Sequence, residues 1–141
     1  MLKVVKFGGS SVASVEQFRK VKAVMEADPA RRVAVISAAG KRTPDDHKMT
    51  DLLYLVHAHL RYGVPADDIL AVLRSRLVEI RDGLGLAFPI EREFDEYAAS
   101  LSKETGADEL VSRGEYFTSR LMAEYLGFAF VDAADVVQFT Y

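Results

Sequence analysis

The sequence predicts an α/β fold with a mainly parallel sheet, because two buried strands flank one helix and a long helical stretch follows them. Residues 2–7 and 32–37 are short β-branched and apolar runs, and each ends at small residues. Between them, apolar residues recur at helical spacing from Ser14 up to Asp28 and Pro29. A strand-helix-strand unit strongly prefers parallel pairing through a right-handed crossover. The ends of both strands should therefore open on the same edge of the sheet.

The remaining chain is predominantly helical. After a polar loop at 41–48, apolar stripes mark helices at 52–60, 69–80 and 94–101. The most strongly patterned helix covers 110–125, with Gly127 in the position of a C-terminal cap. Residues 128–131 then predict a third strand, and residues 136–141 are also strand-like. Because an apolar strand edge is usually covered, we expect the chain to end inside a longer domain; a short terminal strand is the alternative.

Composition restricts the classes of function. The chain has 141 residues, of which 50% are hydrophobic and 28% charged, so it can form one domain with a real core. It has no Cys, which excludes disulfides and thiolate metal sites. Its net charge is -3, so it lacks the excess of positive charge that binds a nucleic acid or an anionic bilayer, and we expect neither as a partner. The N-terminal apolar run is too short for a signal peptide, so we expect a cytoplasmic protein.

The segment from Lys6 to Val12 carries the first candidate site. Lys6 ends the first strand, and two glycines and two hydroxyl residues follow it. Gly8 and Gly9 permit positive φ angles and let backbone N–H groups approach an anion closely, while the next helix start adds a favourable dipole. These are the features of a phosphate site, although the segment matches neither the Walker pattern nor the dinucleotide fingerprint. A strand-to-helix turn without a ligand explains the same residues equally well.

A second run of small residues, from Ser37 to Gly40, ends the second strand, and Thr50 follows the polar loop. Ligands in open α/β sheets bind beyond the carboxyl ends of the strands, so this segment should line the same crevice as Gly8 and Gly9. Two alternatives remain open. The small residues are turn material, and Thr50 is the N-cap of the next helix.

The third candidate lies in the fourth helix, where Ser112 and Glu115 have the spacing of a capping box. The functional alternative is that Glu115 presents its carboxylate to a cationic group such as a substrate ammonium. The three histidines form no metal constellation, and we expect no metal ligands in this chain. We interpret Asp45 and Asp46 as a solvated charge pair.

Together these segments resemble, in order and spacing, the aspartate kinase family of the amino-acid kinase fold. Chains of that family begin with Lys-Phe-Gly-Gly-Thr-Ser-Val, continue to a Val-Val-Ser-Ala-like strand end and a Thr-Asp-Leu-Leu helix start, and later carry Ser-x-Gly-Glu before an Asp-Ala strand end. The matching segments here are residues 6–12, 35–38, 50–53, 112–115 and 132–133. The resemblance thus covers the whole chain.

The resemblance implies a three-layer α/β/α domain of the carbamate kinase-like type, present here as its N-terminal half with a helical insertion at 51–105. On that basis, residues 1–141 are the N-terminal portion of a catalytic domain. The nucleotide-binding half and the small regulatory domains of the family are absent. The full-length protein is expected to be a homo-oligomer.

The activity that the resemblance implies is transfer of the γ-phosphoryl group of ATP to L-aspartate, which gives ADP and 4-phospho-L-aspartate. This is the first step towards lysine, threonine and methionine, and it uses ATP with Mg²⁺. Carried over by position, Lys6 is the catalytic residue that neutralises phosphate charge. The residues implied to bind ATP phosphates are Lys6, Phe7, Gly8, Gly9 and Ser10, and those implied to bind aspartate are Ser37, Thr50 and Glu115.

Two departures from the family pattern matter. Ser10 stands where the family commonly has Thr, which keeps the hydroxyl. The later Gly-Arg-Gly-Gly-Ser-Asp segment of the family has no match here, so we expect the isolated chain to be inactive. Two alternatives remain: a phosphotransferase of the same fold that acts on acetylglutamate or a nucleoside monophosphate, and a non-catalytic module that binds a ligand or a partner.

Overall fold

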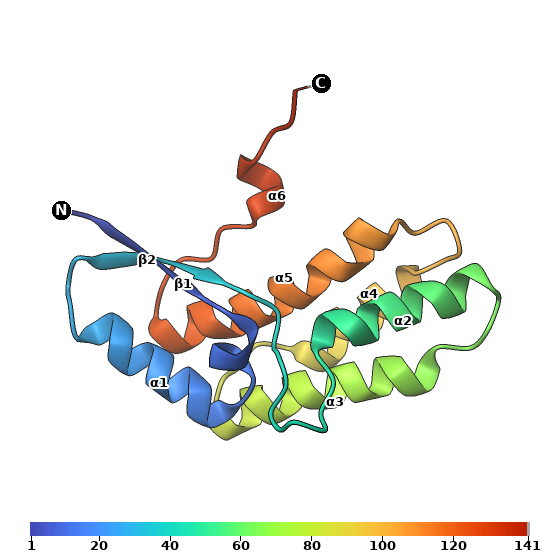
Figure 1. Ribbon diagram of the computed structural model, residues 1–141, viewed down its shortest axis with the longest axis horizontal. Helices are drawn as coiled ribbons and strands as arrows, with labels where there is room; N and C mark the ends of the chain where they lie inside the picture. Colours follow the sequence, from blue (N-terminus) through green and yellow to red (C-terminus); the bar gives the residue numbers. More distant parts are fainter. Residues whose placement is uncertain (141) are drawn as a thin grey trace.

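The computed structural model describes residues 1–140 and shows a small parallel sheet lying over a group of helices (Figure 1). The α/β class and the predominance of helix after the second strand are confirmed. The elements in chain order are β1 (Lys3–Phe7), the 3₁₀ turn η1 (Gly9–Val12), α1 (Val15–Glu26), β2 (Arg31–Ile36), α2 (Met49–Arg61), α3 (Asp67–Leu84), α4 (Ile90–Ser100), α5 (Ala107–Leu126) and α6 (Ala133–Val136).

The two strands pair in parallel, as the strand-helix-strand pattern predicts. Lys6 lies opposite Val35, and Phe7 opposite Ile36. The helix between the strands starts at Ser14, whose Oγ accepts a hydrogen bond from the N–H of Gln17 at 3.4 Å. Parallel pairing puts the ends of β1 and β2 at the same edge of the sheet.

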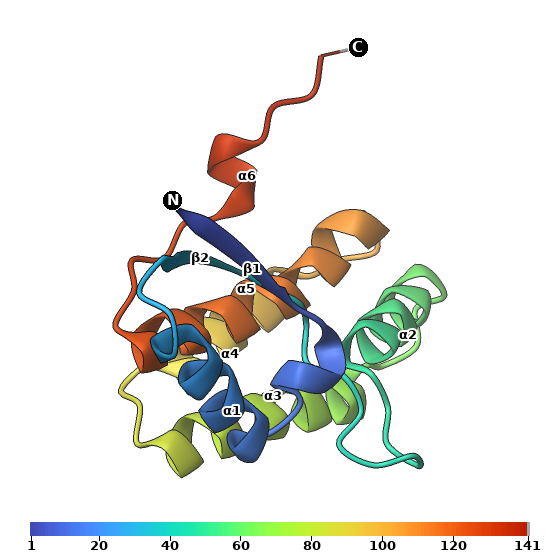
Figure 2. The same ribbon diagram turned by 60° about the vertical axis from the view of Figure 1, so that its left-hand side comes forward.

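Helices cover one face of this sheet. Both views show the strands on one side of the molecule, with α1 and α5 on the other (Figures 1 and 2). On the covered face Phe7 is buried, whereas Val4, Val33 and Val35 on the other face are 60%, 41% and 46% exposed. Within residues 1–140 the sheet therefore has one helical layer, and the second layer of the expected three-layer arrangement is not present.

The expected third strand at 128–131 is wrong. The N–H of Phe128 bonds to the carbonyl of Ala123 and closes the end of α5, and the Phe130 ring packs on the Tyr116 ring with centroids 5.5 Å apart. A strand needs a neighbouring strand to satisfy its backbone groups, and in the described part of the chain none pairs with this segment. The segment instead packs on α5, and the chain leaves the body of the molecule only after it, as an arm that carries α6 (Figure 1).

The strand-like pattern from 136 to 141 is also not realised over the residues that are described. Residues 133–136 form the short helix α6, and Asp132 caps it by accepting a hydrogen bond from the N–H of Ala134 at 2.9 Å. Residues 137–140 have no regular structure, and Tyr141 lies outside the described residues. An Asx cap thus competes successfully with an unpartnered strand.

Helix α5 lies at the centre of the core and contacts α1, α2, α3 and β2. Its predicted apolar face is buried, and Gly127 ends the helix in the left-handed conformation at φ 71°, both as expected. The largest fully buried side chains are Phe18, Met49, Leu73, Leu77, Ile90, Leu110, Leu121 and Met122. Among the helices of residues 1–140, none combines the length and apolar character needed to cross a bilayer.

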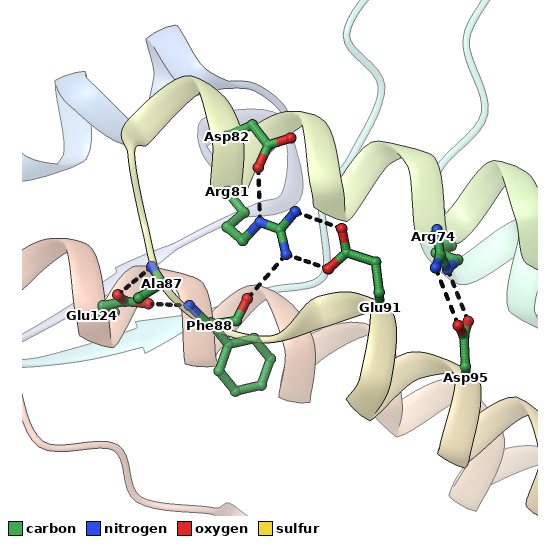
Figure 3. A network of polar contacts seen from close by, with 8 residues as sticks. All are labelled: Arg74, Arg81, Asp82, Ala87, Phe88, Glu91, Asp95 and Glu124. Atoms are coloured by element: carbon green, nitrogen blue, oxygen red, sulfur yellow. Dashed lines mark hydrogen bonds and ion pairs between the residues drawn. The ribbon is translucent and has the colours of Figure 1, made fainter.

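Polar contacts join α3 to α4 at the surface (Figure 3). Arg81 forms a bidentate ion pair with Glu91, in which Nη2 and Oε1 are 2.6 Å apart. Arg74 forms a second bidentate pair with Asp95, with nitrogen–oxygen distances of 2.8 and 3.1 Å. The carboxylate of Glu124 on α5 accepts the N–H groups that precede α4, at 2.7 and 3.1 Å. These contacts orient α4 against the rest of the core.

The Arg81–Glu91 pair predicts a pH dependence of stability. Hydrogen bonds from Arg81 lower the pKa of Glu91 from 4.5 to about 2. A carboxylate with a lowered folded-state pKa stabilises the fold fully above its unfolded pKa, and this contribution disappears as the pH falls through the folded pKa. Urea unfolding of Glu91→Gln should therefore show lower stability than the unaltered chain at pH 7, with a difference that shrinks from about pH 4.5 to about pH 2. Asp45→Asn serves as the control, and a difference independent of pH would contradict the assignment.

Candidate functional site

The ends of the two strands and their following turns are joined by backbone hydrogen bonds. The N–H of Ser37 donates to the carbonyl of Phe7 at 3.2 Å, and the N–H of Gly40 donates to the carbonyl of Gly9 at 2.8 Å. The expectation that the two small-residue segments lie together at one sheet edge is confirmed. We call this junction, residues 8–10 and 37–40, the strand-end rim.

Two glycines make this approach possible. A Cβ atom on Gly40 would lie 2.6 Å from the carbonyl carbon of Gly9, and a Cβ on Gly9 would lie 3.0 Å from the carbonyl oxygen of Ala38. The neighbouring atoms belong to the backbone and cannot rotate away. Close packing of main chain on main chain is therefore the reason for glycine at these two positions.

Gly8 is different. Its φ of -77° and ψ of 172° are open to any residue, and neither Gly8 nor Gly9 uses the positive φ that glycine permits. A Cβ on Gly8 would meet nothing within 4 Å. Packing inside residues 1–140 therefore does not require glycine here. The N–H groups of Gly9 and Ser10 donate no hydrogen bond within the same residues.

Helix α5 lies directly against the strand-end rim. A Cβ on Gly114 would lie 2.9 Å from Ala38 Cβ and 3.1 Å from Leu53 Cδ1, so Gly114 lets α5 approach both β2 and α2. Glu115 is the next residue along the helix and is exposed. The third candidate segment thus lies beside the second, as a site shared by all three segments requires.

The capping-box interpretation of Ser112 and Glu115 is wrong. Helix α5 begins at Ala107, five residues before Ser112, and the Ser112 hydroxyl donates to the carbonyl of Glu109 at 2.7 Å. Backbone donors this far inside a helix are already paired along the helix. Within residues 1–140, the carboxylate of Glu115 forms no hydrogen bond or ion pair, which leaves it available for another group.

The start of α2 also contacts the strand-end rim. The N–H of Met49 donates to the carbonyl of Ala39 at 3.0 Å, which places Thr50 one residue beyond the contact. The N-cap position belongs to Lys48, so the alternative role for Thr50 as an N-cap is wrong. Thr50 and Ser37 are both half-buried, and their hydroxyls form no hydrogen bond with other described residues.

Lys6 precedes this rim on β1. It is exposed on the face of the sheet that the helices leave open, and its ammonium makes no hydrogen bond or ion pair in the described part of the chain. By contrast, Lys3 on the same strand pairs with Asp28 at 2.6 Å. The rim and its surroundings therefore carry unengaged groups of both signs: the ammonium of Lys6, backbone N–H groups and the carboxylate of Glu115.

The polar loop 41–48 covers a charged cluster that its sequence pattern did not reveal. The expected solvated pair at Asp45 and Asp46 is wrong for Asp46, whose carboxylate binds the backbone N–H and Nε of Arg42 at 2.9 and 2.8 Å. Hydrogen bonds from Arg42 hold the pKa of Asp46 well below its usual range. Arg76 on α3 lies 3.7 Å from the same carboxylate.

A signal for Arg76 was present in the sequence. It occupies a position on the buried stripe of α3 between Leu73 and Ile80, where a charge stands out among apolar residues. Arg76 is 4% exposed, and burial lowers its pKa. A charged residue on an apolar stripe requires polar partners inside the fold, and the carbonyls of the 40–47 segment supply them.

The donors around the strand-end rim suit an anion. Ammonium and free backbone N–H groups are the usual partners of phosphate oxygens. Within residues 1–140 no group of three or more His, Asp or Glu side chains is placed to hold a metal ion.

The chain is similar to known proteins in both sequence and structure. The chain is 34% identical over 138 residues to aspartokinase 3 of Bacillus subtilis, across 94% of this chain and 30% of that protein. The crystal structure of Clostridium acetobutylicum aspartate kinase matches with a TM-score of 0.88 and 40% identity, over 93% of this chain and 30% of that one. The chain is an aspartokinase relative. It has the amino-acid kinase fold, and the sequence-based resemblance is confirmed.

The matched region is the N-terminal part of the aspartokinases, about 30% of their length. Escherichia coli aspartokinase III in complex with aspartate and ADP matches with a TM-score of 0.69 and 27% identity, over 90% of this chain and 29% of that one. The same enzyme in complex with lysine and aspartate matches with a TM-score of 0.68 and 28% identity, over 89% and 29%. No family model matches the chain.

The close contact at the strand-end rim predicts the effect of a small substitution. Gly40→Ala forces the Gly9 backbone to move, and overpacking of this kind should lower the free energy of unfolding by about 1–3 kcal/mol in a urea titration. Gly8→Ala is the matched control and should leave stability unchanged, because its Cβ enters open space. Equal effects of the two substitutions would show that the contact does not determine the position of the turn.

Proposed function

We propose that this aspartokinase relative supplies the phosphate-binding and aspartate-binding parts of an aspartate kinase, which transfers the γ-phosphoryl group of ATP to the side-chain carboxylate of L-aspartate. The observation that carries the proposal is the strand-end rim, where segments far apart in sequence meet with their polar groups unengaged. The remaining nucleotide-binding residues come from outside this chain, in a catalytic domain of which residues 1–141 form the N-terminal portion.

The phosphate side of the site is the turn after β1. The backbone of Phe7, Gly8, Gly9 and Ser10 borders the phosphates, and the free N–H groups of Gly9 and Ser10 donate to their oxygens. Gly8 has no Cβ, and the space that a Cβ would occupy is open, so a phosphate can come close to the main chain there. Lys6 neutralises the negative charge that spreads over the transferred group.

The acceptor side lies on the other two segments. The hydroxyls of Ser37 and Thr50 bind the aspartate, and the exposed carboxylate of Glu115 holds its ammonium. An acetylated amine carries no charge for Glu115 to bind, and a nucleoside monophosphate repels it, so this residue favours a free amino acid over both alternative acceptors.

The chemistry suits these groups. A carboxylate with a pKa of about 4 is ionised at neutral pH and attacks phosphorus without a general base. Catalysis therefore depends on alignment of acceptor and donor and on stabilisation of negative charge, which Lys6 and the N–H groups provide. Magnesium supplies further positive charge when it is bound to the nucleotide. Because no described carboxylate cluster faces the rim, we assign it no ligand here.

A chimera tests the proposal. Residues 1–141 replace the corresponding part of the Clostridium acetobutylicum aspartate kinase, and aspartate-dependent ADP formation is measured. The chimera should turn over, and Lys6→Ala should reduce kcat by about 100-fold or more, because a positive group at the transferring phosphate is lost. The isolated 141-residue chain should show no turnover.

Lys3→Ala, on the same strand but away from the rim, is the matched control and should retain activity. Retained activity of the Lys6→Ala chimera would contradict the role of Lys6. ADP formation by the isolated chain would show that it needs no further residues. An inactive chimera whose circular dichroism shows a folded protein would favour a non-catalytic binding module instead.

Glu115→Ala separates the two sides of the site. Loss of a charge partner for the ammonium should raise the KM for aspartate by about 30-fold, the equivalent of ~2 kcal/mol, and leave the KM for ATP nearly unchanged. Glu109→Ala on the same helix is the control, since Glu109 is exposed and its carboxylate has no partner among the described residues. Equal weakening of aspartate and ATP would contradict the ammonium-binding role.

A further inference from the structure

Arg76 is the only charged residue that is buried within residues 1–140, and it lies outside the rim described above. Its guanidinium reaches from α3 to the segment between β2 and α2. Nη2 donates to the carbonyl of Gly40 at 2.6 Å, and Nη1 donates to the carbonyl of His47 at 2.8 Å. The two acceptors lie at opposite ends of the polar loop 41–48. One buried side chain therefore fixes both ends of the loop.

The loop is folded so that it presents these two carbonyls together. Arg42 and Asp46 close it with hydrogen bonds at 2.8, 2.9 and 3.1 Å, and the same carboxylate lies 3.7 Å from Arg76 and balances its charge. A planar guanidinium holds two acceptors in a fixed relative geometry, which a flexible ammonium cannot do.

The residues proposed to bind ligand lie immediately next to the points that Arg76 holds. The N–H of Gly40 donates to the carbonyl of Gly9 in the turn after β1. The N–H of Met49, the residue before Thr50, donates to the carbonyl of Ala39. Ser37 stands three residues before Gly40. The turn after β1 is therefore connected to the guanidinium through Gly40, and Ser37 and Thr50 each lie three residues along the chain from one of its two acceptors.

The third nitrogen of the guanidinium, Nε, has an unusual environment. It is buried and has no hydrogen-bond partner among the described residues. A buried donor without a partner destabilises a fold. In native proteins such unsatisfied groups are rare and are often found at functional sites. An apolar residue at this stripe position would fill the core without this penalty, but it would leave the two carbonyls unheld.

We propose that Arg76 is a positioning residue for the acceptor side of the site: by holding Gly40 and His47 it fixes the segment from Ser37 to Thr50 in the arrangement that binds aspartate. This inference rests on the proposed function for its catalytic consequence. Its structural consequence, a loop held in one position by one side chain, is independent of that function.

The first experiment uses hydrogen exchange of the 141-residue chain. Arg76→Met keeps an unbranched stem that reaches about as far as Nε and removes the guanidinium donors, so the protection of the Gly40 and Met49 amides should fall by about tenfold or more. The Phe128 amide, which bonds to Ala123, is the internal reference and should be unchanged. Arg74→Met is the matched control on the same helix, because Arg74 is partly exposed and, among residues 1–140, pairs with Asp95 alone. Unchanged protection of Gly40 and Met49 would overturn the inference.

If Arg76→Met lowers the protection of all amides, the Phe128 amide included, Arg76→Lys decides the matter. Lysine retains the charge but cannot bond both carbonyls in fixed geometry. Selective loss of protection at Met49 or Gly40 supports the inference, and a pattern identical to that of the unaltered chain overturns it.

The second experiment measures kinetics in the chimera with the Clostridium enzyme. Arg76→Lys should raise the KM for aspartate by about tenfold, more than it raises the KM for ATP, because displaced binding groups weaken alignment of the acceptor. A purely structural role predicts less active protein with unchanged KM values, and that result would overturn the inference. Failure of the proposed function is distinguishable, since it appears as an inactive chimera with the unaltered chain, whereas the exchange experiment still reports on the loop.

Discussion

The contact of main chain on main chain between Gly9 and Gly40 is the constraint on which the arrangement of the site depends. Parallel pairing brings the ends of β1 and β2 to one edge, but only glycine at both positions lets the following turns approach to hydrogen-bonding distance. Gly114 also allows a close approach, but to side chains: a Cβ there would lie 2.9 Å from Ala38 Cβ, so glycine lets α5 pack against the end of the second segment. Three segments far apart in the sequence therefore meet at positions where glycine leaves room for a neighbour.

Charge is distributed to match this geometry. Several charges away from the rim are paired across elements, as in Arg81–Glu91, Arg74–Asp95 and Lys3–Asp28, whereas others, such as Glu109, have no partner among the described residues. At the rim and beside it, Lys6 and Glu115 have no partner among the described residues. In the proposed site, these two charges of opposite sign suit a ligand pair with an anionic phosphoryl donor and a cationic group on the acceptor. Arg76 connects the helical core to the proposed site, since its buried guanidinium on α3 binds the carbonyls of Gly40 and His47.

Much of the fold and part of the site were predictable from sequence. Helical spacing located α1 to α5, Gly127 marked the end of α5, and the strand-helix-strand pattern gave the parallel pair. The glycine pair and Glu115 stood out as unusual residue types at strand ends and on a helix face. Their meaning was ambiguous, however: the capping-box spacing of Ser112 and Glu115 is also satisfied inside a helix, where no donor needs a cap.

Local patterns thus determined which residues form helices and strands, because periodicity and end signals depend on neighbours in sequence. Whether an apolar run such as 128–131 becomes a strand depends on a partner strand, which only the assembled sheet can offer, and residues 1–140 offer none to it. The tertiary structure alone decided that Asp46 lies 3.7 Å from Arg76, and that Gly8 faces open space whereas Gly40 does not. Such facts depend on distances between segments far apart in the chain, which no local pattern encodes.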